Sequence, residues 1–136
     1  MPDYYDAAQR HWDDANYLLS TARLPNADQL FGVSAECALK AIMFPLGMPM
    51  KNGRPADRKK YGHINVLWDE FITFANGKDQ AHYAAALGVT NPFVNWDVGQ
   101  RYENSSVISM QIVTDHKNSA ELAFCCLTQA VVDGVV

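Results

Sequence analysis

A stripe of apolar residues at alternating spacings of three and four predicts a first helix over residues 3–23. The stripe consists of Tyr5, Ala8, Trp12, Ala15, Leu19 and Ala22. The dipeptide Leu24-Pro25 is expected to end this helix, because a proline ring cannot continue the hydrogen-bond ladder. The link that follows is short, so the next helix should be an antiparallel neighbour.

The next segment is apolar on nearly every side, which predicts a buried central helix. A capping-box pattern that starts at Asn26 predicts that this helix runs from there to Phe44. In its second half only Glu36 and Lys40 are charged, and they are one helical turn apart. Charged groups inside an apolar helix cost stability unless they pair or serve a purpose. The pattern therefore predicts an interior polar site.

The remaining pattern predicts two more helices, a minor helix and no convincing strand pair. The predicted segments are a helix over 64–75, a short helix capped by Asp79 that ends at Leu87, and a last helix over 115–133. The start of the last helix stays open, because residues 107–113 are apolar and β-branched and fit a helix, a strand or a coil. Together these elements predict an all-α fold: one domain, residues 1–136, built as an antiparallel four-to-five-helix up-and-down bundle.

Length and charge narrow the function classes. The chain has 136 residues, of which 19% are charged, and its formal net charge is −4 at pH 7. This charge argues against nonspecific nucleic-acid binding by the whole surface, although a local basic patch is compatible with it. No apolar run has the length of a membrane span. The three cysteines lack a C-x-x-C spacing and are predicted to be core thiols, so we expect a cytoplasmic protein that does not enter a membrane.

The basic residues gather in one loop between residues 45 and 62. This loop contains Lys51, Arg54, Arg58, Lys59 and Lys60 and a single acid, Asp57. It could bind phosphate, with Tyr61 available to stack on a base. The alternative is an ordinary solvated loop.

The histidines are scattered and do not have the spacing of metal ligands. Neither a phosphate-binding glycine loop nor a Ser-His-Asp order is present. No metal and no cofactor are therefore predicted.

The polar pair in the buried helix has two interpretations, and the nearby glycine and two histidines each have an expected role. Glu36 and Lys40 are either a partly exposed pair or a site that organises an Arg or His from elsewhere in the chain. Gly32, one turn earlier, would allow a backbone or a ligand to approach closely. His63 stands where it could cap the helix that follows, and His116 is expected to be a satisfied core histidine.

Several short motifs resemble those of the HEPN superfamily of small helical bundles. The resemblance rests on His11-Trp12-x-x-Ala15, on Asn26-Ala27-x-x-Leu30 leading into Ala35 to Ala41, on Gly62-His63, on Trp96 with Arg101-Tyr102, and on the final Asp133-Gly134. The resemblance implies a bundle that often forms homodimers. It also implies a link to RNA cleavage, nucleotide binding, toxin–antitoxin modules and phage defence, with a nucleotidyltransferase or a toxin or antitoxin as a possible partner.

The chain departs from the catalytic pattern of that superfamily, an Arg followed after four to six residues by His at the start of the last helix. After Arg101 the next histidine is His116, fifteen positions on, while Arg58 and His63 have the spacing but precede an earlier helix. The leading hypothesis is therefore a non-catalytic or degenerate HEPN-like domain that binds a nucleotide, RNA or a partner protein. The ligand-binding residues predicted for it are Glu36, Lys40, His63, Trp96, Arg101 and Tyr102.

Two other functions stay open. One is a metal-independent endoribonuclease in which Arg101 stabilises the phosphate and His63 or His116 transfers the proton. The other is a purely structural bundle for protein interaction, which an exposed apolar helix face without a polar cleft would favour.

Overall fold

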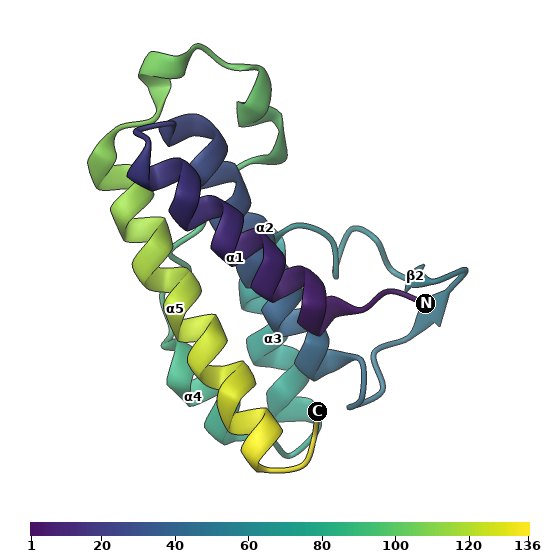
Figure 1. Cartoon of the computed structure of the whole chain (residues 1–136). Coiled ribbons are helices and arrows are strands. Elements are labelled where there is room, and N and C mark those ends of the chain that lie inside the picture. Colours follow the sequence, from purple (N-terminus) through teal and green to yellow (C-terminus); the bar gives the residue numbers. More distant parts are fainter.

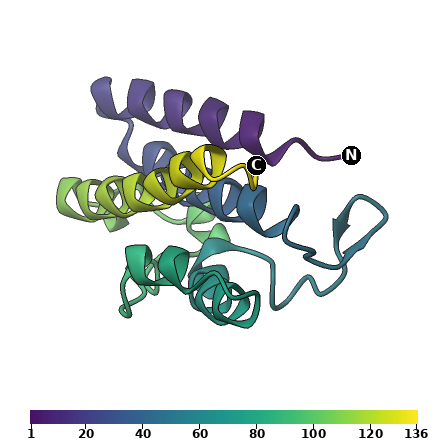
Figure 2. The same cartoon turned by 90° about the horizontal axis from the view of Figure 1, so that it is seen from below.

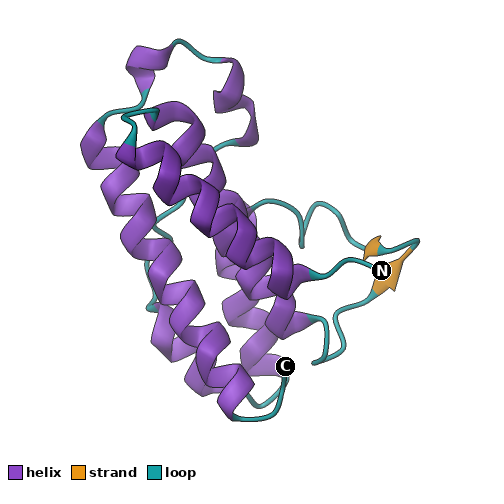
Figure 3. Ribbon diagram, in the orientation of Figure 1, coloured by secondary structure: helices purple, strands orange, loops and turns teal.

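The computed structural model describes residues 1–136 and contains five α-helices with one very small sheet. The helices are α1 (Tyr4–Ser20), α2 (Leu24–Met43), α3 (Ile64–Gly77), α4 (Ala81–Leu87) and α5 (Met110–Val132). The minor elements are the strands β1 (Met50–Lys51) and β2 (Arg54–Pro55) and the 3₁₀ helices η1 (Val98–Tyr102) and η2 (Ser105–Val107). Figure 3 shows how far helices dominate the molecule, and the prediction of an all-α helical bundle is confirmed.

The helices lie in three layers around α2. In Figure 2, α1 forms one outer layer, α2 and α5 form the middle layer, and α3 and α4 form the other outer layer. Helix α2 packs against α1, α3 and α5, and 13 of its 20 residues are buried. The prediction of a buried central helix is therefore confirmed.

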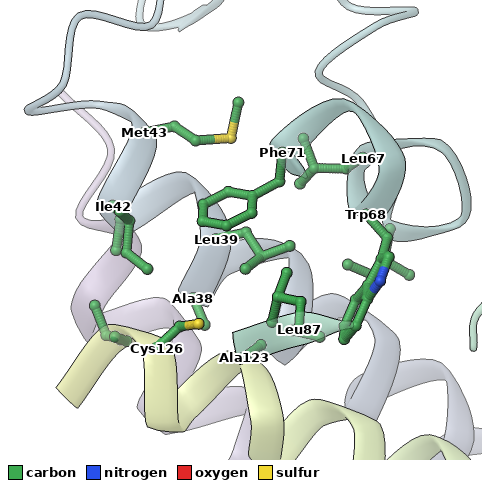
Figure 4. Close-up of a cluster of buried hydrophobic side chains, with 14 of the residues drawn as sticks. Ala38, Leu39, Ile42, Met43, Leu67, Trp68, Phe71, Leu87, Ala123 and Cys126 are labelled. Carbon is green, nitrogen blue, oxygen red and sulfur yellow. The ribbon is translucent and has the colours of Figure 1, made fainter. Parts of the chain in front are cut away.

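The main core lies where α2 meets α3, α4 and α5. Figure 4 shows Leu39 and Met43 of α2 facing Phe71 and Leu67 of α3, with Leu87 completing the layer. These five side chains are at most 4% exposed. Each large apolar side chain buried in this way contributes about 1.5–3 kcal/mol, so the core holds α2 firmly in the position that presents its polar face.

The boundary between the first two helices differs from the prediction. Helix α1 ends at Ser20 and not at residue 23, because Ala22 takes a left-handed backbone conformation with φ of 58°. Helix α2 begins at Leu24, so the capping box predicted at Asn26 is wrong. Pro25 does not stop a helix here. It occupies the first turn of α2, where the missing N–H would have had no helical partner.

The later helices are located as predicted, with corrected ends. Helix α3 extends to Gly77, and α4 is preceded by Asp79 with φ of 57°, which does not cap it because Gln80 occupies the N-cap position. The open question about the last helix is resolved, since α5 begins at Met110. The hydroxyl of Ser109 caps it by accepting the backbone N–H of Ile112 at 3.2 Å.

The basic loop contains a β-hairpin, so the prediction of no strand pair is wrong. Strands β1 and β2 pair antiparallel, with Lys51 opposite Arg54. The two residues between them, Asn52 and Gly53, have φ of 53° and 72°, as a tight type I′ hairpin turn requires. Figure 1 shows the hairpin projecting from the bundle beside the N-terminus.

Candidate functional site

The carboxylate of Glu36 joins two basic side chains from different parts of the chain. Its Oε2 accepts a hydrogen bond from Nζ of Lys40 at 3.0 Å, within α2. Its Oε1 lies 3.1 Å from Nδ1 of His63, the residue just before α3. The side chains of Glu36 and Lys40 are only 12% and 8% exposed, whereas that of His63 is 53% exposed. The structure thus brings together three of the predicted site residues.

The environment of His63 favours its protonated form. The hydrogen bond to Glu36 raises the pKa of His63, against the opposing effects of partial burial and of the positive charges of Lys40 and Arg101. Because Nδ1 faces the carboxylate, Nε2 is left without a protein partner. The His63 side chain also makes no capping bond to α3, so it is Glu36 that orients the ring.

His63 and Lys40 line a cleft of about 330 Å³ between the end of α2, the N-terminal segment and the hairpin. Arg54 and Arg58 line the same cleft. Neither arginine forms a salt bridge with any carboxylate of the chain. The cleft therefore carries an excess of positive charge, and guanidinium groups suit phosphate and carboxylate oxygens because they donate in a planar fork.

Two tyrosines complete the walls of the cleft. Nζ of Lys40 lies 5.9 Å from the ring centroid of Tyr4, at the distance of a cation–π contact. Burial, followed by electrostatic interactions with Cys37 and Glu36, raises the pKa of Tyr4, so its phenol stays neutral and can donate a hydrogen bond. Tyr61 is buried and held edge-on against Phe74, with ring centroids 6.0 Å apart.

Two larger hollows have a different character. One of about 480 Å³ is formed by the N-terminal segment, Phe44 and the last two valines, and one of about 500 Å³ lies between α3 and α4. Neither is lined by a lysine, an arginine or a histidine. A further hollow of about 380 Å³ at the hairpin is also basic, since Lys51, Arg54 and Arg58 line it. The cleft at His63 differs from all three because it combines basic groups with a histidine.

Arg101 and Tyr102 lie outside the cleft, on η1. The guanidinium carbon of Arg101 is 5.0 Å from the ring centroid of Tyr102, whose side chain is largely exposed. Arg101 does not contact Glu36, so the expectation that Glu36 orients it is wrong. It remains close enough for its charge to lower the pKa of His63.

Trp96 is part of the core and does not line the cleft. It is 1% exposed, and its Nε1 donates to the backbone carbonyl of Asp28 at 3.1 Å. Its indole lies against Gly32, where a β-carbon would come within 2.2 Å of the ring. The close approach at Gly32 is thus made by the side chain of Trp96 and not, as was predicted, by a backbone or a ligand. The Trp96 ring also lies near His63, with centroids 6.3 Å apart.

His116 is a satisfied core histidine, as predicted. It is 1% exposed, its Nδ1 lies 2.6 Å from Oδ1 of Asp28, and its Nε2 lies 2.8 Å from Oδ1 of Asn95. Phe93 stacks on the ring, with centroids 5.0 Å apart. With both ring nitrogens occupied and no exposed edge, His116 cannot reach a substrate, which leaves His63 as the accessible histidine near Arg101.

Asp28 was not among the predicted residues, although it organises the segment that carries Arg101. It is fully buried, and its Oδ2 accepts a hydrogen bond from Nε2 of Gln100 at 2.6 Å. Its two side-chain partners are 72 and 88 positions away in sequence. No local pattern links residues so far apart, so a single sequence contains no signal for this cluster.

No family model, curated protein or solved structure matches the chain. None of the helices combines the length and the apolar character needed to cross a bilayer. No three His, Cys, Asp or Glu side chains converge as a metal site would require. The chemistry of the cleft is therefore the basis for a functional conclusion.

Proposed function

We propose that the cleft at His63 binds the phosphate of a nucleotide or of an RNA segment, without a catalytic role. The observation that carries this proposal is the convergence of Lys40, Arg54, Arg58 and His63 on one cleft whose only bonded carboxylate is that of Glu36. The nucleotide or RNA character of the ligand is supported by the resemblance of the sequence motifs to HEPN domains.

Each group has a role in the proposed complex. Arg54 and Arg58 bind phosphate oxygens through their free guanidinium groups, and Lys40 adds a fixed charge at the inner end. Glu36 holds Lys40 and His63 in place and favours the protonated form of His63. Arg101 and the exposed ring of Tyr102 lie outside the cleft and could contact a second phosphate and a base of a longer RNA.

The proposal is tested by titrating the protein with AMP and with a fluorescein-labelled octauridylate at 50 mM salt, followed by calorimetry and anisotropy. Arg58→Gln should weaken binding about tenfold, because charge-assisted hydrogen bonds to phosphate contribute about 1.5–3 kcal/mol. Arg23→Gln is the matched control, since Arg23 is exposed in the link between α1 and α2 and lies outside the cleft. Failure of both ligands to bind, or equal losses in the two variants, would contradict the proposal.

The second candidate function is metal-independent RNA cleavage, and the orientation of His63 by Glu36 favours it. A neutral imidazole would take the proton of a ribose 2′-hydroxyl through Nε2. The 2′-oxygen would then attack the phosphorus to form the 2′,3′-cyclic phosphate, the bond from phosphorus to the 5′-oxygen would break, and that oxygen would take a proton from water. Arg101 or Arg58 would stabilise the charge on the phosphate. Incubation of the protein with RNA in EDTA tests this candidate. The candidate requires that the wild type cleaves the RNA and that His63→Gln does not.

The raised pKa of His63 favours the first candidate. A protonated imidazole binds an anion well but cannot accept a proton, so an environment that favours the protonated form suits anion binding better than general-base catalysis. Binding is therefore the leading proposal. A homodimer, also implied by the resemblance, is a separate proposal that light scattering after gel filtration would test.

A further inference from the structure

We infer that the cleft selects a terminal phosphate monoester, which carries two negative charges, over a phosphodiester, which carries one. The inference rests on the proposed function and names the ligand class more closely. A free nucleotide and the phosphorylated end of an RNA share this chemistry, and the experiment below distinguishes them.

The balance of charge in the cleft carries the inference. At its inner end the charge of Lys40 is balanced by the carboxylate of Glu36, which also favours the protonated form of His63. At its rim Arg54 and Arg58 form no salt bridge, which leaves two positive charges uncompensated. A phosphodiester would neutralise one of these two charges, whereas a monoester dianion neutralises both.

The acids next to the cleft in sequence are already engaged. The carboxylate of Asp3 caps α1 by accepting the backbone N–H of Asp6 at 2.9 Å. That of Asp57 accepts the backbone N–H groups of Lys59 and Lys60 at 3.2 and 2.9 Å. Neither carboxylate lines the cleft, so neither supplies the missing negative charge.

The start of α3 adds a second source of positive potential. His63 occupies the N-cap position of this 14-residue helix without a side-chain capping bond. The backbone N–H groups of Ile64 and Asn65 have no acceptor within the protein, since the first amides of α3 that are bonded belong to Val66 and Leu67. Neither residue lines the cleft, so α3 acts through the aligned dipoles at its N-terminus, which add positive potential at His63.

The size of the cleft agrees with a terminal group. Its volume of about 330 Å³ lies at the low end of small-molecule sites, which span roughly 300–1,000 Å³. A compact phosphate with the adjoining ribose fits such a volume more readily than several nucleotides of a continuous strand. The ring of Tyr4, beside Lys40, is placed to contact the sugar or base that follows.

The experiment compares matched ligands that differ in one charge. AMP and UMP are titrated against their 5′-methyl phosphate esters at pH 7, and 5′-phosphorylated octauridylate is titrated against the 5′-hydroxyl oligonucleotide. The monoesters should bind about tenfold more tightly or better, as expected for one added charge at contact distance from a partly buried cation. A preference seen with nucleotides alone identifies a free nucleotide, and one seen also with the oligonucleotides identifies an RNA end.

Two variants and a spectroscopic measurement complete the test. Arg58→Gln should reduce the preference for the monoester several-fold, and Arg23→Gln should leave it unchanged. Phosphorus NMR should show the bound monoester losing its second proton at a lower pH than the free ligand. Equal affinities for monoester and diester would overturn the inference while the proposed function stands. Absence of binding by every ligand would overturn both.

Discussion

Oε1 of Glu36 lies 3.1 Å from Nδ1 of His63, and this hydrogen bond is the largest contribution to the raised pKa of the imidazole. Glu36→Gln removes the negative charge while keeping the shape of the side chain. We expect the pKa of His63 to fall in this variant, because burial and the charges of Lys40 and Arg101 then act without opposition. Titration of the histidine ring resonances by NMR measures the change. Glu121→Gln, which removes an exposed acid of α5, is the control variant and should leave the pKa of His63 unchanged.

The same bond makes stability depend on pH. A histidine whose pKa is higher in the folded state stabilises that state fully below its unfolded value of about 6.5, and the contribution is lost as the pH rises through the folded value. The free energy of unfolding of the wild type should therefore exceed that of His63→Gln by more at pH 5.5 than at pH 8. Urea unfolding at the two pH values checks the sign. A difference that is larger at pH 8 would show that Glu36 does not stabilise the protonated ring.

The side chain of Asp28 connects α2 with α5 and η1, so its removal should cost stability. In Asp28→Ala both Gln100 and His116 lose a buried partner at 2.6 Å. Leaving such groups unsatisfied costs about 1–3 kcal/mol each, and we expect a loss of about 3 kcal/mol or more. Asp13→Ala, on the exposed face of α1, should change stability by about 0.5 kcal/mol at most. Denaturant unfolding curves compare the two variants. Similar losses in the free energy of unfolding would show that the hydrogen bonds of Asp28 do not stabilise the fold.

The buried helix and its polar pair could be predicted from the sequence because both signals are local. Glu36 and Lys40 stand at the spacing that pairs side chains along one helix, and the surrounding residues are apolar on every side. The hairpin was also locally encoded, since Asn52-Gly53 is the usual turn of a two-residue β-hairpin, but proline and glycine residues around it masked that signal.

The rest of the site depends on contacts between residues far apart in sequence, which local sequence patterns do not indicate. Arg54 and Arg58 were recognisable as basic, but only folding places them in one cleft with Lys40. Trp96 was predicted as a ligand-binding residue that packs the loop with Arg101, and its buried indole fills the space that Gly32 leaves open without lining the cleft. Sequence spacing alone cannot separate a tryptophan in a binding loop from one that anchors the loop in the core.

The three thiols should differ strongly in reactivity. The prediction of core thiols holds for Cys37 and Cys126 and is wrong for Cys125, which is exposed on α5. Burial raises the pKa of Cys37 to about 12 and that of Cys126 to about 11, so neither forms much thiolate at neutral pH. A disulfide reagent such as DTNB should modify one thiol quickly in the native protein and all three after unfolding. In Cys125→Ser the fast phase should disappear, and its persistence would show that a second thiol is accessible.

Gly32→Ala tests whether the packing of Trp96 outweighs helix propensity. Alanine favours a helix over glycine by about 1 kcal/mol, which alone would stabilise α2. Its β-carbon, however, would lie 2.2 Å from the indole of Trp96, which is fixed by its hydrogen bond to the carbonyl of Asp28. We expect a net loss of about 1–3 kcal/mol in the free energy of unfolding, as for other overpacked core positions, with a shift of tryptophan fluorescence.

Gly77→Ala is the matched control, because no atom lies within 4 Å of a β-carbon at the end of α3. This variant should be neutral or slightly stabilising. If Gly32→Ala were as stable as Gly77→Ala, Trp96 would have to be mobile, and the indole could not be the anchor that holds the segment before η1 against α2.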